Sequence, residues 1–331
     1  MDPPLLRGGE STQLAALPIV SERRLGPTPG VDKMTKTTGD GSGDAVIASV
    51  VIPVRDVELT IAEQLEALEL QTFTEPWEIV VADHGSNDST RDIVRGFQGR
   101  LPRLRLVDAS ACKTVNEVRN RGVSAATGAL LAFCDGDDVV APDWLEQLVS
   151  ALQRYDLVCG SLEARRLNPN STPVRPEPVA DGLPVAMDFL PYAWGGNYGF
   201  HRHVWEALGG FDGGYPPGGD DHEFSWRAQL AGYCLGYAPD AVVHYRFRQG
   251  LWQNIRQHYG YVRSQPLRYK RFREAGLRRS SLRGAALGWA WLLLRSPWLL
   301  RGSGRREQWL REAAVRLGRL VGSLRWRTLY L

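Results

Sequence analysis

Residues 45–54 read AVIASVVIPV, a continuous apolar stretch that is rich in β-branched residues and ends at Arg55 and Asp56. A run of this kind is typical of a strand that is buried on both faces of a sheet. The stretch therefore predicts the first strand of a folded domain that begins at Ala45.

The residues that follow alternate between strand-like and helix-like patterns. Further strands are expected at residues 78–82, 104–107 and 129–134, and helices at residues 59–68, 86–97 and 116–126. This alternation over about 100 residues predicts an α/β fold with an open, mostly parallel sheet flanked by helices. The chain contains neither a P-loop nor a GxGxxG motif, which disfavours a dinucleotide-binding domain.

Polar and acidic residues follow three of the predicted strands, at positions 53–56, 83–88 and 135–138. In open α/β sheets, ligands bind beyond the carboxyl ends of the strands. We therefore expect a functional site where these three segments meet.

Asp135, Asp137 and Asp138 follow the apolar segment LLAFC directly. Carboxylate oxygens suit a hard divalent cation such as Mg²⁺ or Mn²⁺, which can also bridge to diphosphate oxygens. The same acidic turn could instead cap the next helix, and acidic triplets of this kind are common.

Three other polar residues are candidates for chemistry. Asp83 follows the second strand and could accept a hydrogen bond from a ribose or base. Asp221, in GGDDHEF, could serve as a general base toward a hydroxyl group, or Asp220 and Asp221 could simply cap a helix. His244 ends a short apolar strand and is either a metal ligand or an ordinary packed or surface residue.

Six stretches of the chain, taken together, resemble the inverting family 2 glycosyltransferases with a GT-A fold. They are SVVIPVRD (49–56), VVADHGSND (80–88), VRNRGVSAATGALLAFCDGDD (118–138), GGNYGFHRHVWEALGGFD (195–212), GGDDHEFSWRAQLAGY (218–233) and VVHYRF (242–247). Their order and spacing also match, and the resemblance covers residues 46–250.

The resemblance implies a role for each matching residue. The donor-binding residues would be Pro53, Arg55, Asp56, Asp83, Lys113, Arg119, Asn120 and Asp135. Asp137 and His244 would bind a divalent cation, and Asp221 would be the catalytic base. Two positions depart from the family pattern, because His84 replaces an acidic residue and Asp220 replaces a glutamate. Asp220 and Asp221 could therefore exchange roles.

The activity implied is transfer of a sugar from a nucleotide-diphosphate sugar to a hydroxyl acceptor with inversion, in cell-envelope glycan or glycolipid synthesis. We expect Asp83, Asp137 and Asp221 to converge on one cavity. One alternative is a nucleotidyltransferase, which would usually carry a lysine-containing glycine-rich loop that VIPVRDVEL (51–59) lacks. The other is a non-catalytic sugar-binding or scaffold protein, which the intact aspartates disfavour.

The C-terminal region differs sharply in charge from the rest of the chain. Residues 246–331 contain 20 Lys and Arg residues, three Glu residues and six of the 11 tryptophans. Residues 285–300 are apolar but shorter than the ~20 residues that a spanning helix needs, which predicts a segment lying in the membrane interface. Residues 306–324 predict a basic amphipathic helix.

We therefore expect residues 45–250 to form the catalytic domain and residues 251–331 a basic helical tail that contacts an anionic membrane. The protein would be cytoplasmic and peripheral at the inner face of the cell membrane, with a lipid-linked or membrane-proximal acceptor. The tail could instead pack on the domain or on a second copy. Nucleic-acid binding is not expected, because no recognised module is present.

Residues 1–44 are rich in Pro, Gly, Ser and Thr and predict a disordered leader. A basic segment followed by an apolar one is lacking there, so no secretory signal is expected. The four cysteines are scattered, which favours a reducing compartment over a disulfide framework.

Overall fold

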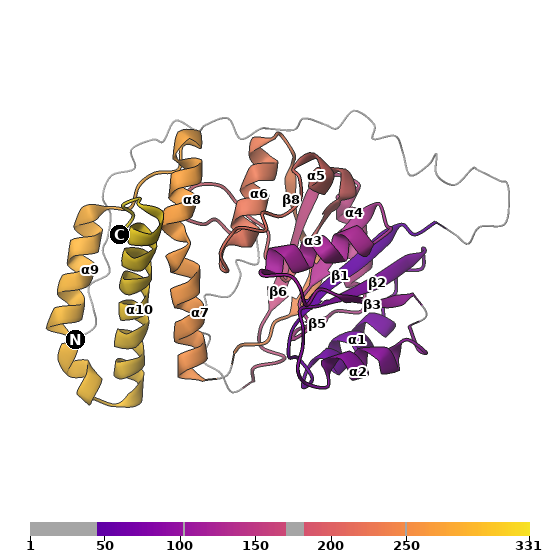
Figure 1. Ribbon diagram of the computed structural model, residues 1–331, viewed down its shortest axis with the longest axis horizontal. Helices are drawn as coiled ribbons and strands as arrows, with labels where there is room; N and C mark the ends of the chain where they lie inside the picture. The colour runs from indigo at the N-terminus through magenta and orange to yellow at the C-terminus, as the bar shows by residue number, and fades with distance from the viewer. Residues whose placement is uncertain (1–44, 102, 170–181, 249) are drawn as a thin grey trace. The chain divides into compact units, whose positions relative to one another are not determined.

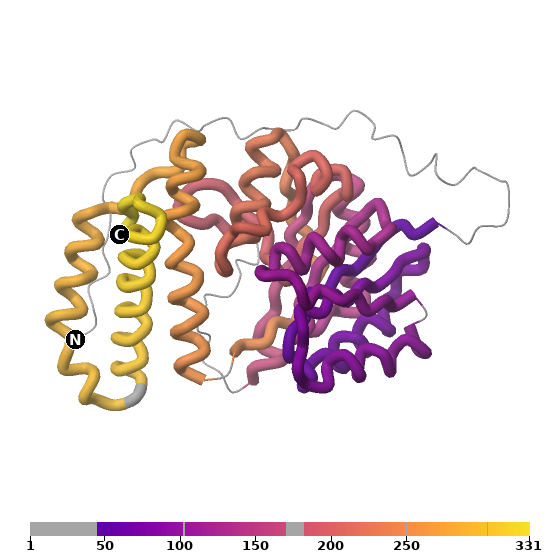
Figure 2. The backbone as a smooth tube through the Cα atoms, viewed as in Figure 1, coloured from indigo at the N-terminus to yellow at the C-terminus, as the bar shows by residue number. Residues whose placement is uncertain are grey.

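The computed structural model describes residues 45–331 except residues 102, 170–181 and 249 (Figure 2). The predicted disordered leader, residues 1–44, lies outside the described residues. All described residues belong to one compact unit, so the predicted boundary between residues 250 and 251 falls inside that unit.

Among the described residues, eight strands form one sheet with the order β3-β2-β1-β4-β7-β6-β8-β5. The strands are β1 (Ala48–Val54), β2 (Trp77–Asp83), β3 (Leu104–Asp108), β4 (Leu130–Cys134), β5 (Val139–Val140), β6 (Leu157–Glu163), β7 (Asn197–His201) and β8 (Leu235–His244). Strand β7 runs antiparallel to β4 and β6, and β5 runs antiparallel to β8, while the other pairs are parallel. The predicted open, mostly parallel α/β sheet is confirmed.

Helices flank this sheet and continue into the C-terminal region (Figure 1). They are α1 (Ile61–Glu69), α2 (Thr90–Phe97), α3 (Val115–Ala125), α4 (Trp144–Leu152), α5 (Arg202–Ala207), α6 (Asp220–Leu230), α7 (Leu251–Arg263), α8 (Gln265–Phe272), α9 (Leu282–Leu294) and α10 (Ser303–Trp326), with the 3₁₀ helix η3 (Ser296–Leu300) before α10. The predicted helical tail is therefore present.

Strand β1 is buried on both faces, as its composition predicts. Val50 and Ile52 belong to the core that includes Leu65 of α1, whereas Val51 belongs to the core that includes Val123 of α3. The alternation follows from the two-residue period of a strand. Figure 1 accordingly shows α1 and α2 on one side of β1–β3 and α3 on the other. The apolar run thus holds the sheet in place between two helical layers.

The C-terminal helices pack on one another, with α10 in contact with α7, α8 and α9 (Figure 1). The predicted amphipathic helix over 306–324 is present as α10, but its buried side carries small residues such as Ala313, Ala314 and Gly322. Bulky residues are exposed instead, including Leu317 at 46% and Leu324 at 71%. No helix in the described part of the chain combines the length and the apolar content needed to cross a membrane.

Substituting Gly322 by Ala is expected to destabilise the protein by about 1–3 kcal/mol, the usual range for overpacking. A Cβ atom at position 322 would lie 2.3 Å from the backbone oxygen of Arg263, because α10 approaches α7 closely there. Chemical denaturation would measure the loss. Gly304→Ala in the same helix is the matched control, since a Cβ there meets nothing within 4 Å. Equal stability of the two variants would contradict this packing.

Candidate functional site

One pocket of about 130 Å³ lies where α3, the end of β4, the loop before β7, the start of α6 and helix α7 meet. It is lined by Arg119, Asp135, Leu162, Trp194, Gly195, Gly196, Gly219, Asp220, Asp221, Tyr245 and Tyr261. Asp135 and Asp221 therefore share a cavity although 85 residues separate them in the sequence. Three of the predicted site residues, Arg119, Asp135 and Asp221, are among the lining residues.

A cluster of three carboxylates lies at the carboxyl end of β4. Oxygens of Asp135, Asp137 and Asp138 lie within 4.8 Å of one another. Asp138 is buried, and its Oδ1 accepts a hydrogen bond of 2.7 Å from the Arg246 backbone N–H, while its buried Oδ2 has no protein partner. A buried oxygen without a partner within an all-oxygen cluster suits a hard divalent cation such as Mg²⁺ or Mn²⁺.

The pKa values of this cluster are shifted in the direction that a cation would offset. Burial, and next the negative charge of Asp137, raise the pKa of Asp135 to about 6. Burial also raises the pKa of Asp137. Burial and the charges of Asp137 and Asp135 raise the pKa of Asp138 well above its usual value. Each ionised carboxylate therefore disfavours ionisation of the neighbouring carboxyl groups, and a bound cation would offset this repulsion.

Mn²⁺ is expected to raise the melting temperature more at pH 7.5 than at pH 5.5. The folded-state pKa of Asp135, about 6, lies above its ordinary value of 3.8. Its ionisation therefore destabilises the metal-free fold increasingly as pH rises from about 4 to 6, and protonation below pH 6 removes this penalty. Protons also compete with the metal, so its apparent affinity should be about four-fold weaker at pH 5.5.

Thermal melts with and without Mn²⁺ at both pH values measure this effect, and the difference at each pH cancels the general effect of acid on stability. NaCl at equal ionic strength is the control. An equal rise in melting temperature at both pH values would contradict the raised pKa of Asp135.

The neighbouring aspartates at the start of α6 have different environments. Asp220 forms an ion pair with the buried guanidinium of Arg119. Although burial alone would lower the pKa of Arg119, the charge of Asp220 raises it. Asp221 Oδ2 accepts a hydrogen bond of 3.2 Å from the Gly195 N–H. Among the described residues, the ion-pair partner of Asp221 is His222, at 3.7 Å. Asp220 is thus held by a permanent cation, whereas Asp221 is not.

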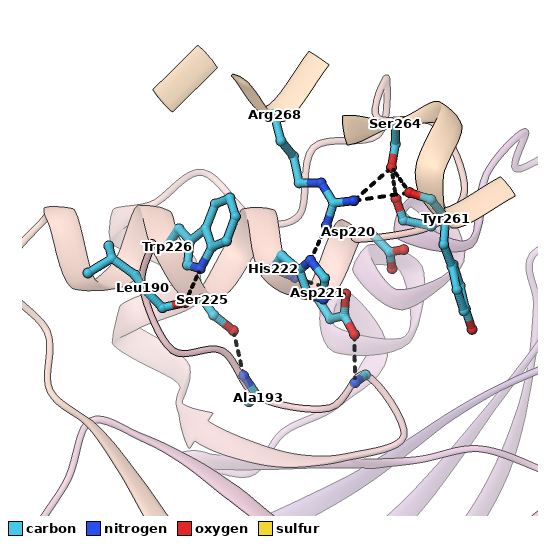
Figure 3. Close-up of polar contacts among 12 residues, drawn as sticks. Leu190, Ala193, Asp220, Asp221, His222, Ser225, Trp226, Tyr261, Ser264 and Arg268 are labelled. Carbon is cyan, nitrogen blue, oxygen red and sulfur yellow. Dashed lines mark hydrogen bonds and ion pairs between the residues drawn. The ribbon is translucent and has the colours of Figure 1, made fainter. Parts of the chain in front are cut away.

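Residues of the C-terminal helices hold the loop that leads into α6 (Figure 3). Arg268 of α8 is buried and hydrogen-bonds to His222 Nδ1, and Ser264 Oγ donates to the Gly218 carbonyl. Gly219 has a φ of 80°, and a Cβ there would lie 2.3 Å from Arg268 Nη1. A glycine is therefore required for both the backbone conformation and the close approach of Arg268. No sequence motif indicated this contact.

The loop before β7 passes close to the charged groups of the pocket. A Cβ at Gly195 would lie 3.1 Å from Arg119 Nη2, and one at Gly196 would lie 2.6 Å from Asp135 Oδ2. These glycines therefore allow the backbone to lie directly against the charged side chains. The adjacent Trp194 contributes an aromatic surface to the same pocket.

The loops after β1 and β2 are joined to each other. Asp56 has a φ of 51°, its N–H donates to Ser86 Oγ at 3.0 Å, and its Oδ1 accepts from the Asn87 N–H at 2.8 Å. Pro53 is partly buried and Arg55 is exposed at this edge. These three predicted donor-binding residues therefore lie at the carboxyl end of β1, and their contact with a nucleotide stays a prediction.

Asp83 does not share the pocket with Asp221. Its side chain is buried, and its Oδ2 accepts from Arg91 Nε at 2.5 Å. The N–H groups of Gly85 and Ser86 also donate to this carboxylate, at 3.2 Å. Asp83 lies at the predicted end of β2, but it is not among the residues that line the pocket with Asp221. Asp137 does not line this pocket either, although its carboxylate lies beside that of Asp135, which does. A contact with a base or ribose stays a prediction that requires Arg91 to move.

The side-chain amide of Asn120 forms hydrogen bonds within the fold, to Trp205 and Phe211. Its Oδ1 accepts from Trp205 Nε1 and from the Phe211 N–H, both at 2.9 Å, and its Nδ2 donates to the Phe211 carbonyl at 2.8 Å. The side-chain amide of Asn120 is therefore already engaged within the fold, and its expected contact with the donor stays a prediction. Lys113 is exposed before α3, its backbone N–H bonds to Glu117, and its predicted role is untested.

His244 is not part of the carboxylate cluster. Its Nδ1 lies 2.8 Å from Glu163 Oε2, and its Nε2 lies 2.9 Å from Arg166 Nη1. Both ring nitrogens are therefore engaged, so binding of a cation by His244 would require it to give up one of these contacts and stays a prediction. Arg246, two residues later, reaches the cluster instead, with its Nε donating to the Asp137 carbonyl at 2.9 Å. Its presence in the matching stretch VVHYRF was the available sequence signal.

Comparison with known proteins places this site in a recognised context. Residues 49–208 match the family described as Glycosyl transferase family 2, and residues 183–317 match that described as Glycosyl transferase family group 2. Glycosyltransferase AglE of Haloferax volcanii is 31% identical over 198 residues, which are 59% of this chain and 65% of that protein.

A second relative is the UDP-Glc:alpha-D-GlcNAc-diphosphoundecaprenol beta-1,3-glucosyltransferase WfgD of Escherichia coli. It is 29% identical over 114 residues, which are 34% of this chain and 44% of that protein. The chain thus covers less than two thirds of the length of each of these relatives.

The fold matches a solved structure, the mannosyltransferase PcManGT from Pyrobaculum calidifontis in complex with GDP-Man and Mn²⁺. The TM-score is 0.59 at 21% identity, and the match covers 89% of this chain and 91% of that one. The expected GT-A-type fold is therefore confirmed.

Proposed function

Because the chain belongs to family 2 of the glycosyltransferases, we propose that it transfers a sugar from a nucleotide-diphosphate sugar to a hydroxyl acceptor with inversion of configuration. The observation that carries this proposal is the convergence of Asp135 and Asp221 on one pocket, with further carboxylates beside Asp135. The carboxylates at Asp135 suit a cation and a diphosphate, and Asp221 offers a base.

Asp135, Asp137 and Asp138 would hold Mg²⁺ or Mn²⁺, which when bound offsets charge on the departing nucleoside diphosphate. Asp221 accepts the proton of the acceptor hydroxyl while that oxygen bonds to the anomeric carbon. The bond from this carbon to the diphosphate oxygen breaks on the opposite face, so the configuration inverts. Asp220 is engaged in an ion pair with the buried guanidinium of Arg119, so Asp221 rather than Asp220 is assigned as the base.

The acceptor in this proposal is lipid-linked or close to a membrane, and the product belongs to a cell-envelope glycan. Two observations support it. The relative WfgD is named for a diphosphoundecaprenol-linked acceptor. Residues 246–331 also carry 20 basic residues against three acidic ones, which favours an anionic membrane surface. The protein would then act as a peripheral enzyme at the cytoplasmic face.

A panel of nucleotide sugars with Mg²⁺ or Mn²⁺ tests the proposal. Release of nucleoside diphosphate, followed by mass spectrometry of the product, is the expected result with one donor. Formation of a nucleotide sugar from a nucleoside triphosphate and a sugar phosphate would instead identify a nucleotidyltransferase. Donor binding without turnover on any hydroxyl acceptor would favour a sugar-binding or scaffold protein.

A further inference from the structure

Helix α9 exposes an apolar face. Ala285 and Leu292 are buried, and α9 packs on α10. Other apolar positions recur at helical spacing on the exposed surface, where Leu287, Leu293 and Leu294 are 63%, 75% and 81% exposed. We call this stripe the α9 face, and it consists of Ala286, Leu287, Ala290, Leu293 and Leu294.

The turn after α9 extends this apolar surface and adds aromatic and basic groups. Leu300 at the end of η3 is 93% exposed. The rings of Trp291 and Trp298 meet edge to face with centroids 5.5 Å apart. The guanidinium of Arg295 lies 4.4 Å from the Trp298 ring centroid and 5.6 Å from that of Trp291. Tryptophan and arginine beside exposed leucines are typical of a surface at the bilayer interface.

The charge around the α9 face determines which partner suits it. Between Glu274 and Glu307 the chain has seven arginines and no acidic residue. A second copy that docked on this face by two-fold symmetry would bring these arginines toward each other, which is unfavourable. An anionic phospholipid surface provides both the apolar layer and the opposite charge.

We propose that the α9 face and Leu300 insert into the headgroup layer of an anionic phospholipid bilayer while the nearby arginines contact lipid phosphates. This inference rests on the proposed function, because it identifies the surface that brings the enzyme to a membrane-bound acceptor. Helix α10 packs on both α9 and α7, and α7 contributes Tyr261 to the pocket. Docking through α9 therefore holds a helix of the active site near the bilayer.

Flotation of the full chain with vesicles tests this surface. The wild type is expected to float with vesicles of phosphatidylglycerol and phosphatidylcholine but not with phosphatidylcholine alone, and high salt should weaken binding. The double variant Leu293→Asp/Leu294→Asp should lose at least about ten-fold in vesicle partition, since two inserted leucines become charged. The matched control is Leu70→Asp/Leu230→Asp, at leucines 69% and 49% exposed on the sheet domain, which should float like the wild type.

The proposal would be overturned if the double variant Leu293→Asp/Leu294→Asp, the α9 variant, floated as well as the wild type. It would also be overturned if the wild type did not bind anionic vesicles. A wild-type dimer that this variant converts to a monomer, seen by light scattering, would also overturn it by showing that a second copy covers the face. Release of nucleoside diphosphate in vesicle-free buffer reports on the proposed function separately. The α9 variant should retain this release.

Discussion

Replacing Asp221 by Asn is expected to lower kcat about 10²–10⁴-fold, the usual contribution of a general base. Asparagine keeps the shape of the side chain and can still accept the hydrogen bond from the Gly195 N–H. It cannot take up the proton of the acceptor hydroxyl. Donor affinity, measured by calorimetry with Mn²⁺, should remain within about two-fold because the carboxylate cluster is unchanged.

Asp220→Asn is the matched comparison at the adjacent position. It leaves the buried guanidinium of Arg119 without its counter-charge, which typically destabilises a protein by about 3–5 kcal/mol. We therefore expect a lower melting temperature for this variant and an unchanged one for Asp221→Asn. Near-normal turnover of Asp221→Asn would disprove the assignment of Asp221 as the base. If turnover is lost in Asp220→Asn but not in Asp221→Asn, Asp220 is the base instead.

Asp137→Ala is expected to lower kcat/KM by about 10²-fold or more, because it removes one of three carboxylates that would hold the cation. Donor binding that depends on Mn²⁺ should be lost in parallel, as measured by calorimetry with and without the metal. The metal-free melting temperature should not fall, since the charge of Asp137 contributes to the raised pKa of Asp135 and Asp138.

Asp92→Ala provides the control for this variant. Its side chain is 81% exposed on α2 and lies outside the cluster, so metal-dependent donor binding should be unchanged. If donor binding by Asp137→Ala still depends on Mn²⁺, the cation is held by residues other than this cluster.

Much of the fold could be predicted because its signals are local. The run that became β1 is buried on both faces, and the acidic residues after LLAFC lie at the end of β4 as expected. Strand β7, which inserts antiparallel between β4 and β6, had no comparable signal. Pairing direction depends on the path of the connecting chain, which a strand's own residues do not encode.

The site was predicted less completely. The matching stretches led to Asp135, Asp137 and Asp221, but Asn120 and His244 use their polar atoms for contacts within the fold. A motif specifies the residue type and its position along the chain. It does not specify which neighbour satisfies a buried polar group, and a group that is fully engaged must give up a partner before it can bind a ligand.

The class of the sheet, the strand ends that carry the acidic residues, and the basic character of the C-terminal region can all be read from the amino-acid sequence. These features depend on side-chain periodicity and composition within short segments. Three features became visible only in the folded chain: Arg119 pairs with Asp220 across 101 positions, Arg268 lies against His222, and α10 buries its small residues while Leu317, Leu320 and Leu324 are exposed. Each of these features depends on how segments far apart in the chain pack against one another, and that packing arises only when folding brings them together.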